Sequence, residues 1–477
     1  MNWHINHWAI VVAIAWLICI VMIPVVLRRQ FTPGASIAWI GIIFLHPYIG
    51  VLLYFLVGEN RLGRQRDAHH RELVARYRPG RPAVPSTTPA TSDKPDDDWE
   101  PVALQAAKVG RLPVVGGNAI EFFTDSVKLV DRLIADIDAA KSTVHLLYFI
   151  LAPDETGRRV ANALTAAVAR GVTCRLLVDA FASRIILRKG GLADELRGKG
   201  VKVAAALPTS LLRRRDLRNH RKLAIIDGSV AFAGSQNMIN ADYDGKCGGP
   251  WHDLTGRFTG PIVAQFSAVF AEDWAFETPE VLDLPPNSNH TTDASPARMQ
   301  LVPTGPVLAS ESYRRVLLGA IQAARRRLII TTPYFVPDDP TLVALVMAAD
   351  RGVDVTLILP RVSDQFYTAF AGRAHYAKLM EAGVKIFLFR PGLVHSKTTT
   401  VDETLALFGS ANLDVRSFNL NFELSILAYD QDVTDRLRQI QLAYLNDSVQ
   451  VNLEQWRARP AIKRYTDSAV SLLSPLL

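Results

Sequence analysis

The feature that most constrains this chain is a long polar pattern that occurs twice. Residues 220–237 and residues 395–412 both follow the order H-x-K-x4-D-x6-G-S-x-N. Such a pattern, with six fixed positions, rarely recurs by chance. In a strand, side chains alternate with period two, so the His and Lys of each copy are expected on one face. The chain is therefore expected to contain a duplicated unit, with one copy of the pattern in each half.

The surroundings of the two copies also look alike. Short apolar runs at 144–149 and 328–335 each continue into a helix-like stretch. A polar-Gly break and a second buried-strand run follow, at 172–179 and 353–360. Short apolar strands that alternate with helices are typical of a layered α/β fold. The sequence therefore predicts two similar α/β lobes related by pseudo-twofold symmetry.

Two polar stretches set the domain boundaries. Residues 61–100 are basic at first, then rich in Pro, and end in an acidic cluster, while residues 286–297 hold Asn, Ser, Thr and His between prolines. Both are typical of linkers. They delimit a first lobe at 101–285 and a second lobe at 298–477 that ends in a helical tail, each of domain size.

Two long apolar runs precede these lobes. Residues 8–27 and residues 35–57 contain no charged side chain. Each run is long enough to cross a hydrocarbon core of about 30 Å as a helix. A signal peptide is disfavoured because no Lys or Arg precedes the first run and no A-x-A-like cleavage site follows it. Residues 1–60 are therefore expected to form an anchor of two transmembrane helices.

Charge predicts how the anchor is oriented. The connection between the runs carries Arg28 and Arg29, whereas a larger cluster follows the second run. The positive-inside rule puts that larger cluster in the cytoplasm. We therefore expect a multi-pass membrane protein, with both lobes on the cytoplasmic face. The cluster consists of Arg61, Arg64, Arg66, Arg71, Arg76 and Arg78.

Composition limits the kind of binding partner and the kind of cellular compartment. The net charge of +7 favours anionic partners, but it does not choose between nucleic acid and acidic lipid. The three cysteines, Cys19, Cys174 and Cys247, have no CxxC spacing, so a disulfide framework is not expected and a reducing compartment fits.

The residue types of the repeated pattern indicate the chemistry. Imidazole can act as nucleophile, acid or base near neutral pH, and lysine is a point charge suited to a phosphate oxygen. With the amide donors of asparagine, two copies make a cationic pocket for a phosphodiester. Zinc is the competing interpretation of paired histidines, with His252 as a further ligand. Neither copy brings Cys or a second His at ligand spacing, so no metal and no cofactor are expected.

The paired patterns resemble those of the phospholipase D superfamily, over residues 114–446. The segments 218–222 and 409–423 are similar to those of bacterial cardiolipin synthases, and so is 54–58 at the end of the second apolar run. At His252 that family often has Arg. The resemblance implies two phospholipase D-type lobes, each with a mixed sheet flanked by helices.

The resemblance also implies a reaction. One histidine attacks the phosphorus of phosphatidylglycerol, the other protonates the leaving glycerol, and a hydroxyl of a second phosphatidylglycerol resolves the phosphatidyl-histidine. The products are cardiolipin and glycerol. By analogy His220 is the nucleophile and His395 the acid and base, although symmetry leaves the opposite assignment open. Charge on the non-bridging oxygens would be stabilised by Lys222, Lys397, Asn237 and Asn412.

The remaining candidate residues support this set. Asp227 and Asp402 complete the two catalytic motifs, but they follow the strand and are expected to brace its turn. Asp253 and Glu423 lie at similar distances in sequence after their motifs and are expected to orient the histidines. Ser235 and Ser410 are counted with the phosphate-binding and supporting group. The implied partners are phosphatidylglycerol, cardiolipin and an anionic membrane, without nucleic acid or an obligate protein partner.

Three other functions compete with this one. A hydrolytic phospholipase D would use the same site with water as acceptor. A membrane-tethered nuclease of the superfamily is usually short, with one motif per chain. A non-enzymatic scaffold would require decayed motifs, and both are intact. The basic loop 211–218 is expected at the mouth of the site, against an anionic bilayer.

Overall fold

The structure is a computed structural model that describes residues 3–28, 33–58, 63–78, 98–208, 217–243, 245, 247–284, 297–306 and 312–472. It contains two compact units: residues 1–64 with 209–217, and residues 65–208 with 218–477. The first unit carries the apolar runs, and the second holds both copies of the repeated pattern. Most of the basic loop 211–218, namely 211–216, lies outside the described residues.

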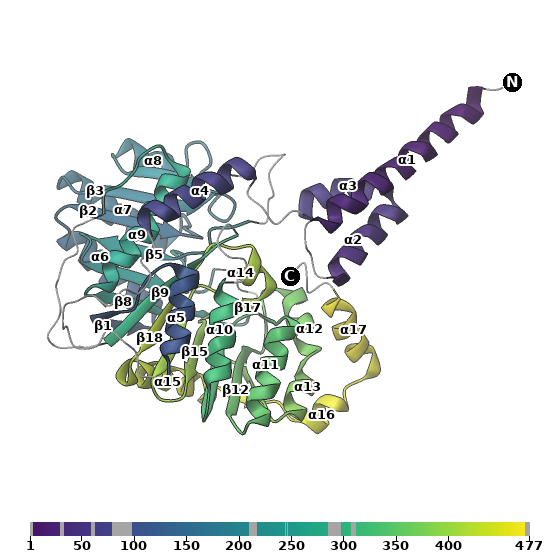
Figure 1. Ribbon diagram of the computed structural model, residues 1–477. Coiled ribbons are helices and arrows are strands. Elements are labelled where there is room, and N and C mark those ends of the chain that lie inside the picture. The colour runs from purple at the N-terminus through teal and green to yellow at the C-terminus, as the bar shows by residue number, and fades with distance from the viewer. Residues whose placement is uncertain are drawn as a thin grey trace. The chain divides into compact units, whose positions relative to one another are not determined.

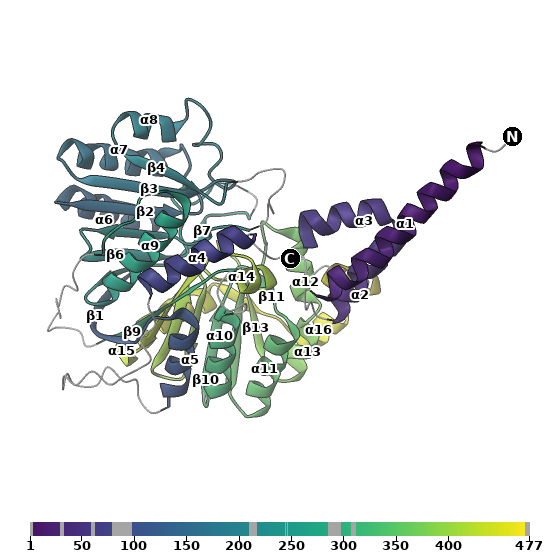
Figure 2. The same ribbon diagram turned by 45° about the horizontal axis from the view of Figure 1, so that its top comes forward.

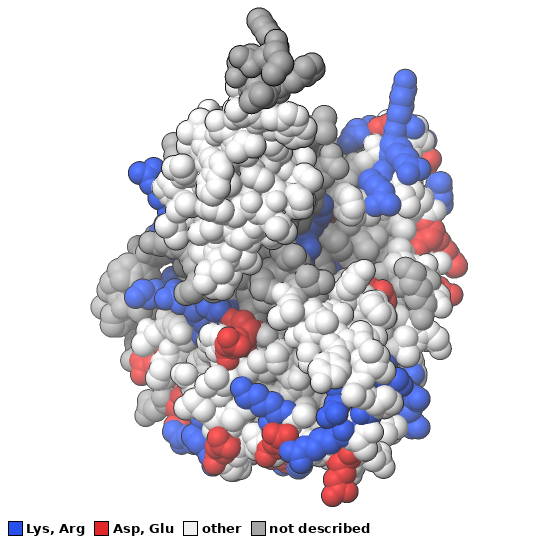
Figure 3. All heavy atoms as spheres, turned by 90° about the vertical axis from the view of Figure 1, so that its right-hand side faces the viewer, with Lys and Arg blue, Asp and Glu red and all other residues white. Residues whose placement is uncertain are grey.

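The first unit begins with an apolar helix. Helix α1 (Trp3–Leu27) reaches a mean hydropathy of 3.1 within His7–Leu27, and it is the one helix of the described residues long and apolar enough to cross a membrane. One face of α1 is exposed, as Trp8, Trp16 and Leu17 show, each more than half exposed, while Cys19, Met22 and Val26 are buried. Figure 3 shows α1 and the two helices that follow it, α2 (Pro33–Leu45) and α3 (Pro47–Leu53), as an almost uncharged surface. An apolar surface of this kind suits a lipid environment.

The second apolar run forms several shorter elements. Helix α2 (Pro33–Leu45) is followed by α3 (Pro47–Leu53) and the π-helix η1 (Tyr54–Gly58). The break lies at His46, whose φ of −142° and ψ of 80° are not helical, because the residue before a proline disfavours the helical region. Gly50 allows α3 to approach α2 closely, since a Cβ there would lie 2.7 Å from the Cα of Ile43. The prediction of a second spanning helix is therefore not confirmed by the structure and stays a prediction.

The second unit is built on one mixed sheet, seen in Figures 1 and 2. Within its first half the parallel neighbours β2, β3 and β4 follow one another, while the other pairs of that half are antiparallel. In sheet order these strands are β1 (Val115–Phe123), β8 (Thr255–Thr259), β6 (Val230–Gly234), β5 (Leu223–Ile226), β2 (Thr143–Tyr148), β3 (Thr173–Asp179) and β4 (Lys202–Ala206).

The second half repeats this order on the other side of β1. Its strands, outward from β1, are β9 (Ala297–Thr304), β18 (Glu423–Tyr429), β16 (Leu405–Gly409), β15 (Thr398–Val401), β10 (Arg327–Thr331), β12 (Asp354–Pro360), β13 (Lys385–Phe389) and β19 (Ser448–Gln450). Apart from β19, each strand has a counterpart at the same distance from the β1–β9 pair. The predicted α/β fold with a mixed sheet is confirmed.

Helices pack on both faces of this sheet (Figures 1 and 2). Aspartates 125, 154 and 338 accept hydrogen bonds from backbone N–H groups at the starts of α6, α7 and α11, which fixes where these helices begin. The first half contains α6 (Ser126–Ala139), α7 (Glu155–Ala169), α8 (Leu192–Gly198) and α9 (Ile262–Glu277). The second half contains α10 (Ser312–Ala323), α11 (Asp339–Asp350), α12 (Phe366–Arg373), α13 (Tyr376–Glu381), α14 (Val415–Asn419), α15 (Gln431–Asn446), α16 (Leu453–Arg457) and α17 (Ala461–Ser471).

Two helices near the start of the second unit depart from the domain boundaries drawn from sequence. Helix α5 (Glu100–Gly110) packs in the core of the second half, where Val102 and Ala106 meet Val316. Helix α4 (Arg64–Tyr77) lies within the stretch that composition assigns to a linker. Burial of one apolar face explains α5, because its buried residues recur at helical spacing.

Buried charge holds α4 in place. Arg78, which follows the helix, donates from Nε to Glu272 at 2.7 Å and from Nη1 to the Gly110 carbonyl at 2.9 Å. His70 lies 3.1 Å from the same carboxylate, and Arg66 pairs with Glu277 at 2.7 Å. Two arginines counted for membrane orientation are thus engaged in folding the second unit.

Candidate active site

Both copies of the H-x-K pattern lie immediately before a strand of the sheet. β5 begins one residue after Lys222 and β15 one residue after Lys397. The backbone of each histidine is held by the opposite half: the N–H of His220 donates to the Phe422 carbonyl at 2.9 Å, and that of His395 to the His252 carbonyl at 2.8 Å. The site is therefore assembled across the middle of the sheet from both halves.

The side chain of each histidine also contacts a residue of the opposite half. Nδ1 of His220 lies 3.0 Å from a carboxylate oxygen of Glu423, which belongs to the second half. Nδ1 of His395 lies 2.6 Å from a carboxylate oxygen of Asp253, which belongs to the first half. A carboxylate at Nδ1 fixes the tautomer and leaves Nε2 for chemistry. The structure thus brings together the two histidines and the two carboxylates expected to orient them, and it pairs them between halves.

The Gly-Ser pairs of the pattern hold these carboxylates. Ser235 donates to Asp253 and Ser410 to Glu423, each at 2.5 Å. Gly234 comes before Ser235, and a Cβ there would lie 2.1 Å from the Leu254 carbonyl oxygen. The matched Gly409 would meet the Leu424 oxygen at 2.2 Å, so only glycine lets the strands come this close. The two serines therefore contact the orienting carboxylates.

Both histidines open onto one cavity of about 370 Å³. The motif asparagines Asn237 and Asn412 also line it, and the side-chain oxygen of Asn237 accepts a hydrogen bond from the Ile150 N–H at 3.2 Å. Sequence reasoning assigned no role to most of the other lining residues. They include Phe149, Phe181, Arg218, Tyr243, Trp251, Tyr334, Asp364, Gln365, Thr368, Asp414, Arg416 and Asn421.

The two lysines lie behind the histidines. Lys222 donates to the His220 carbonyl at 2.6 Å, and Lys397 donates to the His395 carbonyl at 2.5 Å. Burial lowers the pKa of Lys222 to about 7 and that of Lys397 to about 8, although nearby carboxylates oppose the shift. An anionic phosphodiester in the cavity would favour their charged forms, so binding and protonation are coupled.

Burial also lowers the pKa of both histidines. The pKa of His395 falls to about 4, with Lys397 adding to the effect and Asp253 opposing it. The pKa of His220 falls through burial, while the Glu423 carboxylate raises it and Lys222 lowers it further. Near pH 7 both imidazoles are therefore neutral before substrate arrives, and a bound phosphate anion would raise their pKa.

The motif aspartates lie at the other end of these strands. Asp227 accepts hydrogen bonds from the N–H groups of residues 141–143, and Asp402 accepts from those of residues 325–327. Both adopt a positive φ, 51° and 45°, which Asp tolerates better than most residues. They brace the turns that follow β5 and β15 and do not line the cavity.

His252, considered from sequence as a metal ligand, has a different contact. Its Nε2 lies 2.7 Å from the Pro391 carbonyl oxygen, and its strand β7 (Trp251–His252) pairs with β14 (Leu393–Val394). This short pairing joins the halves directly before His395. Within the described residues, no group of three His, Cys, Asp or Glu side chains is placed to hold a metal ion.

A hydroxyl and a carboxylate that sequence reasoning missed meet in the cavity wall. The hydroxyl of Tyr334 lies 2.9 Å from both oxygens of Asp364. Burial, and then the charge of Asp364, raise the pKa of Tyr334, so it stays a neutral donor. No motif marks this pair, because the two residues come from separate loops of the second half.

Comparison with known proteins agrees with this geometry. The family model described as "Cardiolipin synthase, PLD-like domain" matches residues 133–274 and 317–442, one segment in each half. Cardiolipin synthase A of Proteus mirabilis (strain HI4320) is 34% identical over 459 residues, covering 94% of both chains. That of Klebsiella pneumoniae (strain 342) is 34% identical over 490 residues, covering 99% of this chain and 98% of the other.

The chain belongs to the cardiolipin synthase family with PLD-like domains. As a member it is an enzyme, a phosphatidyltransferase. The family resemblance seen in the motifs is therefore confirmed over nearly the whole chain. Among solved structures, the phosphatidylserine synthase of Haemophilus influenzae Rd KW20 is similar, with a TM-score of 0.60 over 79% of this chain and all of that one. At 15% identity this likeness shows the fold alone.

Proposed function

We propose that this cardiolipin synthase family member joins two phosphatidylglycerol molecules into cardiolipin and glycerol, through a phosphatidyl-histidine intermediate. The observation that carries the proposal is the crossed arrangement of two histidine–carboxylate pairs around one cavity. Each imidazole is held at Nδ1, so both Nε2 atoms are available to a single phosphodiester. One can attack phosphorus while the other serves the leaving group.

In the first step Nε2 of His220 forms a bond to phosphorus. The bound phosphate anion favours the protonated form of His395. The bond from phosphorus to the glycerol oxygen breaks, and Nε2 of the protonated His395 gives that oxygen its proton. In the second step a hydroxyl of another phosphatidylglycerol gives its proton to His395 and attacks phosphorus. The P–N bond breaks and returns its electron pair to His220. The lysines and asparagines of the motifs stabilise charge on the non-bridging oxygens in both steps.

The acceptor decides between transfer and hydrolysis. Water at about 55 M competes for the intermediate, so transfer requires an oriented alcohol whose effective molarity exceeds that value. We propose that both apolar runs anchor the protein in the bacterial inner membrane, with the second unit on the cytoplasmic face. Such an anchor keeps the cavity at a surface rich in phosphatidylglycerol.

Product analysis with isotope-labelled glycerol tests this function. Purified full-length protein and phosphatidylglycerol should give cardiolipin and glycerol. Because the broken and formed bonds are both phosphodiesters, labelled glycerol in excess should return cardiolipin to labelled phosphatidylglycerol. Phosphatidic acid as the main product, without label in phosphatidylglycerol, would favour the hydrolytic alternative instead.

A further inference from the structure

We propose that the surface around the cavity mouth docks directly onto the anionic bilayer that supplies the substrates. This surface, called the rim below, comprises Phe181 and Ile185 of the first half with Phe366, Tyr367, Ile462 and Tyr465 of the second half. The proposal rests on the proposed function, because an enzyme that consumes lipid must bring its cavity to a bilayer. It assigns that contact to the second unit itself, in addition to the apolar helices of the first unit.

The first side of the rim follows strand β3. Phe181 lines the cavity and is nevertheless 47% exposed, and Ile185, four residues further on, is 52% exposed. Two guanidinium groups lie over the ring of Phe181, that of Arg218 at 4.5 Å and that of Arg184 at 5.2 Å. Apolar side chains are therefore combined with positive charge at this edge of the cavity.

The second side follows β12, the counterpart of β3 in the other half. Gln365 and Thr368 line the cavity, while the side chains between them, Phe366 and Tyr367, are each 57% exposed. Helix α12 thus forms the cavity wall with one face and presents aromatic rings to the outside with another. The rim is continuous with the cavity because the same short helix contributes to both.

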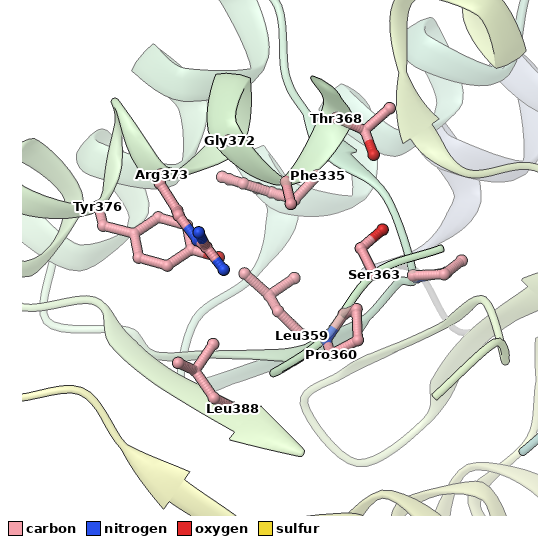
Figure 4. A pocket seen from close by; sticks show the side chains of 11 residues that line it. Phe335, Leu359, Pro360, Ser363, Thr368, Gly372, Arg373, Tyr376 and Leu388 are labelled. Atoms are coloured by element: carbon pink, nitrogen blue, oxygen red, sulfur yellow. The ribbon is translucent and has the colours of Figure 1, made fainter. Parts of the chain in front are cut away.

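The inner face of α12 is already occupied, which explains why the aromatic rings point outward. Figure 4 shows Gly372 and Thr368 on the helix above Phe335, Leu359 and Leu388, around a small pocket. A Cβ on Gly372 would lie 2.2 Å from the Phe335 carbonyl oxygen, so the helix lies as close to β11 (Phe335–Val336) as its backbone permits. Exposure of Phe366 and Tyr367 is therefore a property of the packed fold.

Helix α17 extends the rim. It packs against α12, and the two helices lie side by side in Figure 1. Ile462 and Tyr465, three residues apart on one face, are 71% and 73% exposed. Lys463 and Arg464 are exposed beside them. The acidic residue of this helix, Asp467, is buried and pairs with Arg459 at 3.0 Å, so the charge that α17 presents to the outside is positive.

These features favour an anionic bilayer as the occupant. A basic amphipathic helix with exposed aromatic residues is typical of segments that lie at a membrane interface. The route of the substrate points to the same occupant. The phosphodiester must reach His220 and His395 while the acyl chains remain in the bilayer, so the cavity mouth has to face lipid. Exposed side chains of the rim are those that would enter the bilayer first.

Depth-dependent quenching tests the contact itself. A fluorescent label is attached to the new cysteine of the full-length Phe366→Cys or Tyr465→Cys variant. The labelled protein is then reconstituted in phosphatidylglycerol vesicles whose lipids carry a quencher in the upper part of the acyl chain. The three native cysteines are buried, which limits background labelling. Matched controls are Val343→Cys and Met347→Cys on α11, where the native side chains are 48% and 52% exposed. We expect strong quenching at 366 and 465 and little at 343 and 347.

Two results would overturn the proposal. Equal quenching at rim and control positions would mean that the rim has no preference for lipid. Protection of the rim labels from both the lipid quencher and aqueous iodide would mean that a second copy or another part of the protein covers this face.

Activity provides a second test that does not depend on the labels. The test variant carries glutamine at positions 366, 367, 462 and 465. Its ratio of activity on vesicles to activity on detergent-dispersed substrate should fall by about tenfold, because apolar side chains that would be buried in lipid are gone. Val343→Gln with Met347→Gln should leave this ratio unchanged. An unchanged ratio in the rim variant contradicts docking.

The two proposals fail in different ways. If the wild type makes cardiolipin but its rim labels are not quenched, docking is wrong and the proposed function stands. If the rim labels are quenched but no cardiolipin forms on vesicles or in detergent, the proposed function is wrong.

Discussion

The two halves of the second unit carry the same H-x-K pattern, but the residues that surround its histidine differ between the halves. The ring of His220 lies 4.7 Å from that of Phe149, whereas the ring of His395 lies 4.5 Å from Trp251 and 6.4 Å from Tyr334. The carboxylates differ as well, since Glu423 also accepts hydrogen bonds from the side chains of Ser417 and Asn421. Duplication therefore keeps the geometry of the site while the environments separate the two histidines, which allows them to take different roles.

A second difference lies between the His and the Lys of each copy. Arg221 is fully buried, pairs with Asp273 at 2.6 Å and donates to the Glu423 carbonyl at 3.1 Å. The matched Ser396 carries no charge and is buried beside Tyr444. A charge network thus reaches from the first half to the backbone of the residue that orients His220, and among the residues that the structure describes it has no counterpart at the second histidine.

A third difference lies in the cavity wall. Asp154 and Asp338 are equivalent N-cap residues in the two halves. Ile150 and Tyr334 each lie four residues before them, so these two residues are equivalent as well. The first half therefore presents an apolar side chain where the second half presents the Tyr334–Asp364 pair. The two sides of the cavity wall therefore differ in polarity.

The largest expected effect separates the histidines. His220→Ala should lose about 10⁴-fold in activity and form no adduct, because no other group replaces the nucleophile. His395→Ala should lose a similar amount with phosphatidylglycerol but still form an adduct from a substrate with an activated leaving group, which needs no acid. Intact-protein mass after a mild denaturing quench measures the adduct. An adduct that survives in His220→Ala would reverse the roles.

The next effect compares Arg221 with Ser396. Arg221→Met removes the cation paired with buried Asp273 and leaves the Asn219 side chain as its donor, so a loss of about 3 kcal/mol in stability is expected. Ser396→Ala removes only a buried hydroxyl and should cost about 1 kcal/mol. Thermal unfolding of the full chain in detergent measures both. Equal losses would show that the two halves are braced alike.

The carboxylates should affect opposite limbs of the pH profile. Because Glu423 and Asp253 raise the pKa of their histidines, Glu423→Gln and Asp253→Asn should each lower it further. The profile to follow is that of kcat, which reports the complex in which the bound phosphate has raised the pKa of both histidines. The nucleophile must be neutral, so Glu423→Gln should move the acid limb of this profile to lower pH. The acid must be protonated, so Asp253→Asn should move the alkaline limb to lower pH. Each change should also cost about 10²-fold in rate. Movement of the same limb in both variants would contradict separate roles.

The smallest effect concerns the cavity wall. Tyr334→Phe and Asp364→Asn should each shift the ratio of cardiolipin to phosphatidic acid towards hydrolysis by about tenfold, since an acceptor hydroxyl loses a buried partner. Ile150→Val, at the matched position of the first half, is the control and should leave the ratio unchanged. Quantitative lipid mass spectrometry measures the products. A similar shift in the control would remove this distinction between the halves.

Local patterns predicted some elements well and others poorly. The aspartates that follow β5 and β15 were expected to lie in turns, and they do, but their hydrogen-bond donors include the N–H groups of Ser142 and Arg326, 85 and 76 residues away in the sequence. The anchor shows the opposite case. Residues 35–57 are uniformly apolar, yet the His46–Pro47 step interrupts the helix, and hydropathy does not register a local break of this kind. Likewise, counting Arg66 and Arg78 in the basic cluster that orients the anchor overlooked their buried partners Glu277 and Glu272.

The sequence by itself determined the duplication, the α/β class, the family and the residue types of the chemistry, because the repeated pattern carries all of these in adjacent positions. Only the tertiary structure decided that His220 pairs with Glu423 and His395 with Asp253, each across the two halves. It also brought Tyr334 to Asp364, and it left Phe366 and Tyr367 exposed beside the cavity. These facts depend on how the two halves of the sheet join and on which helix face is already packed. Such contacts between residues far apart in the chain have no local signal from which they could be predicted.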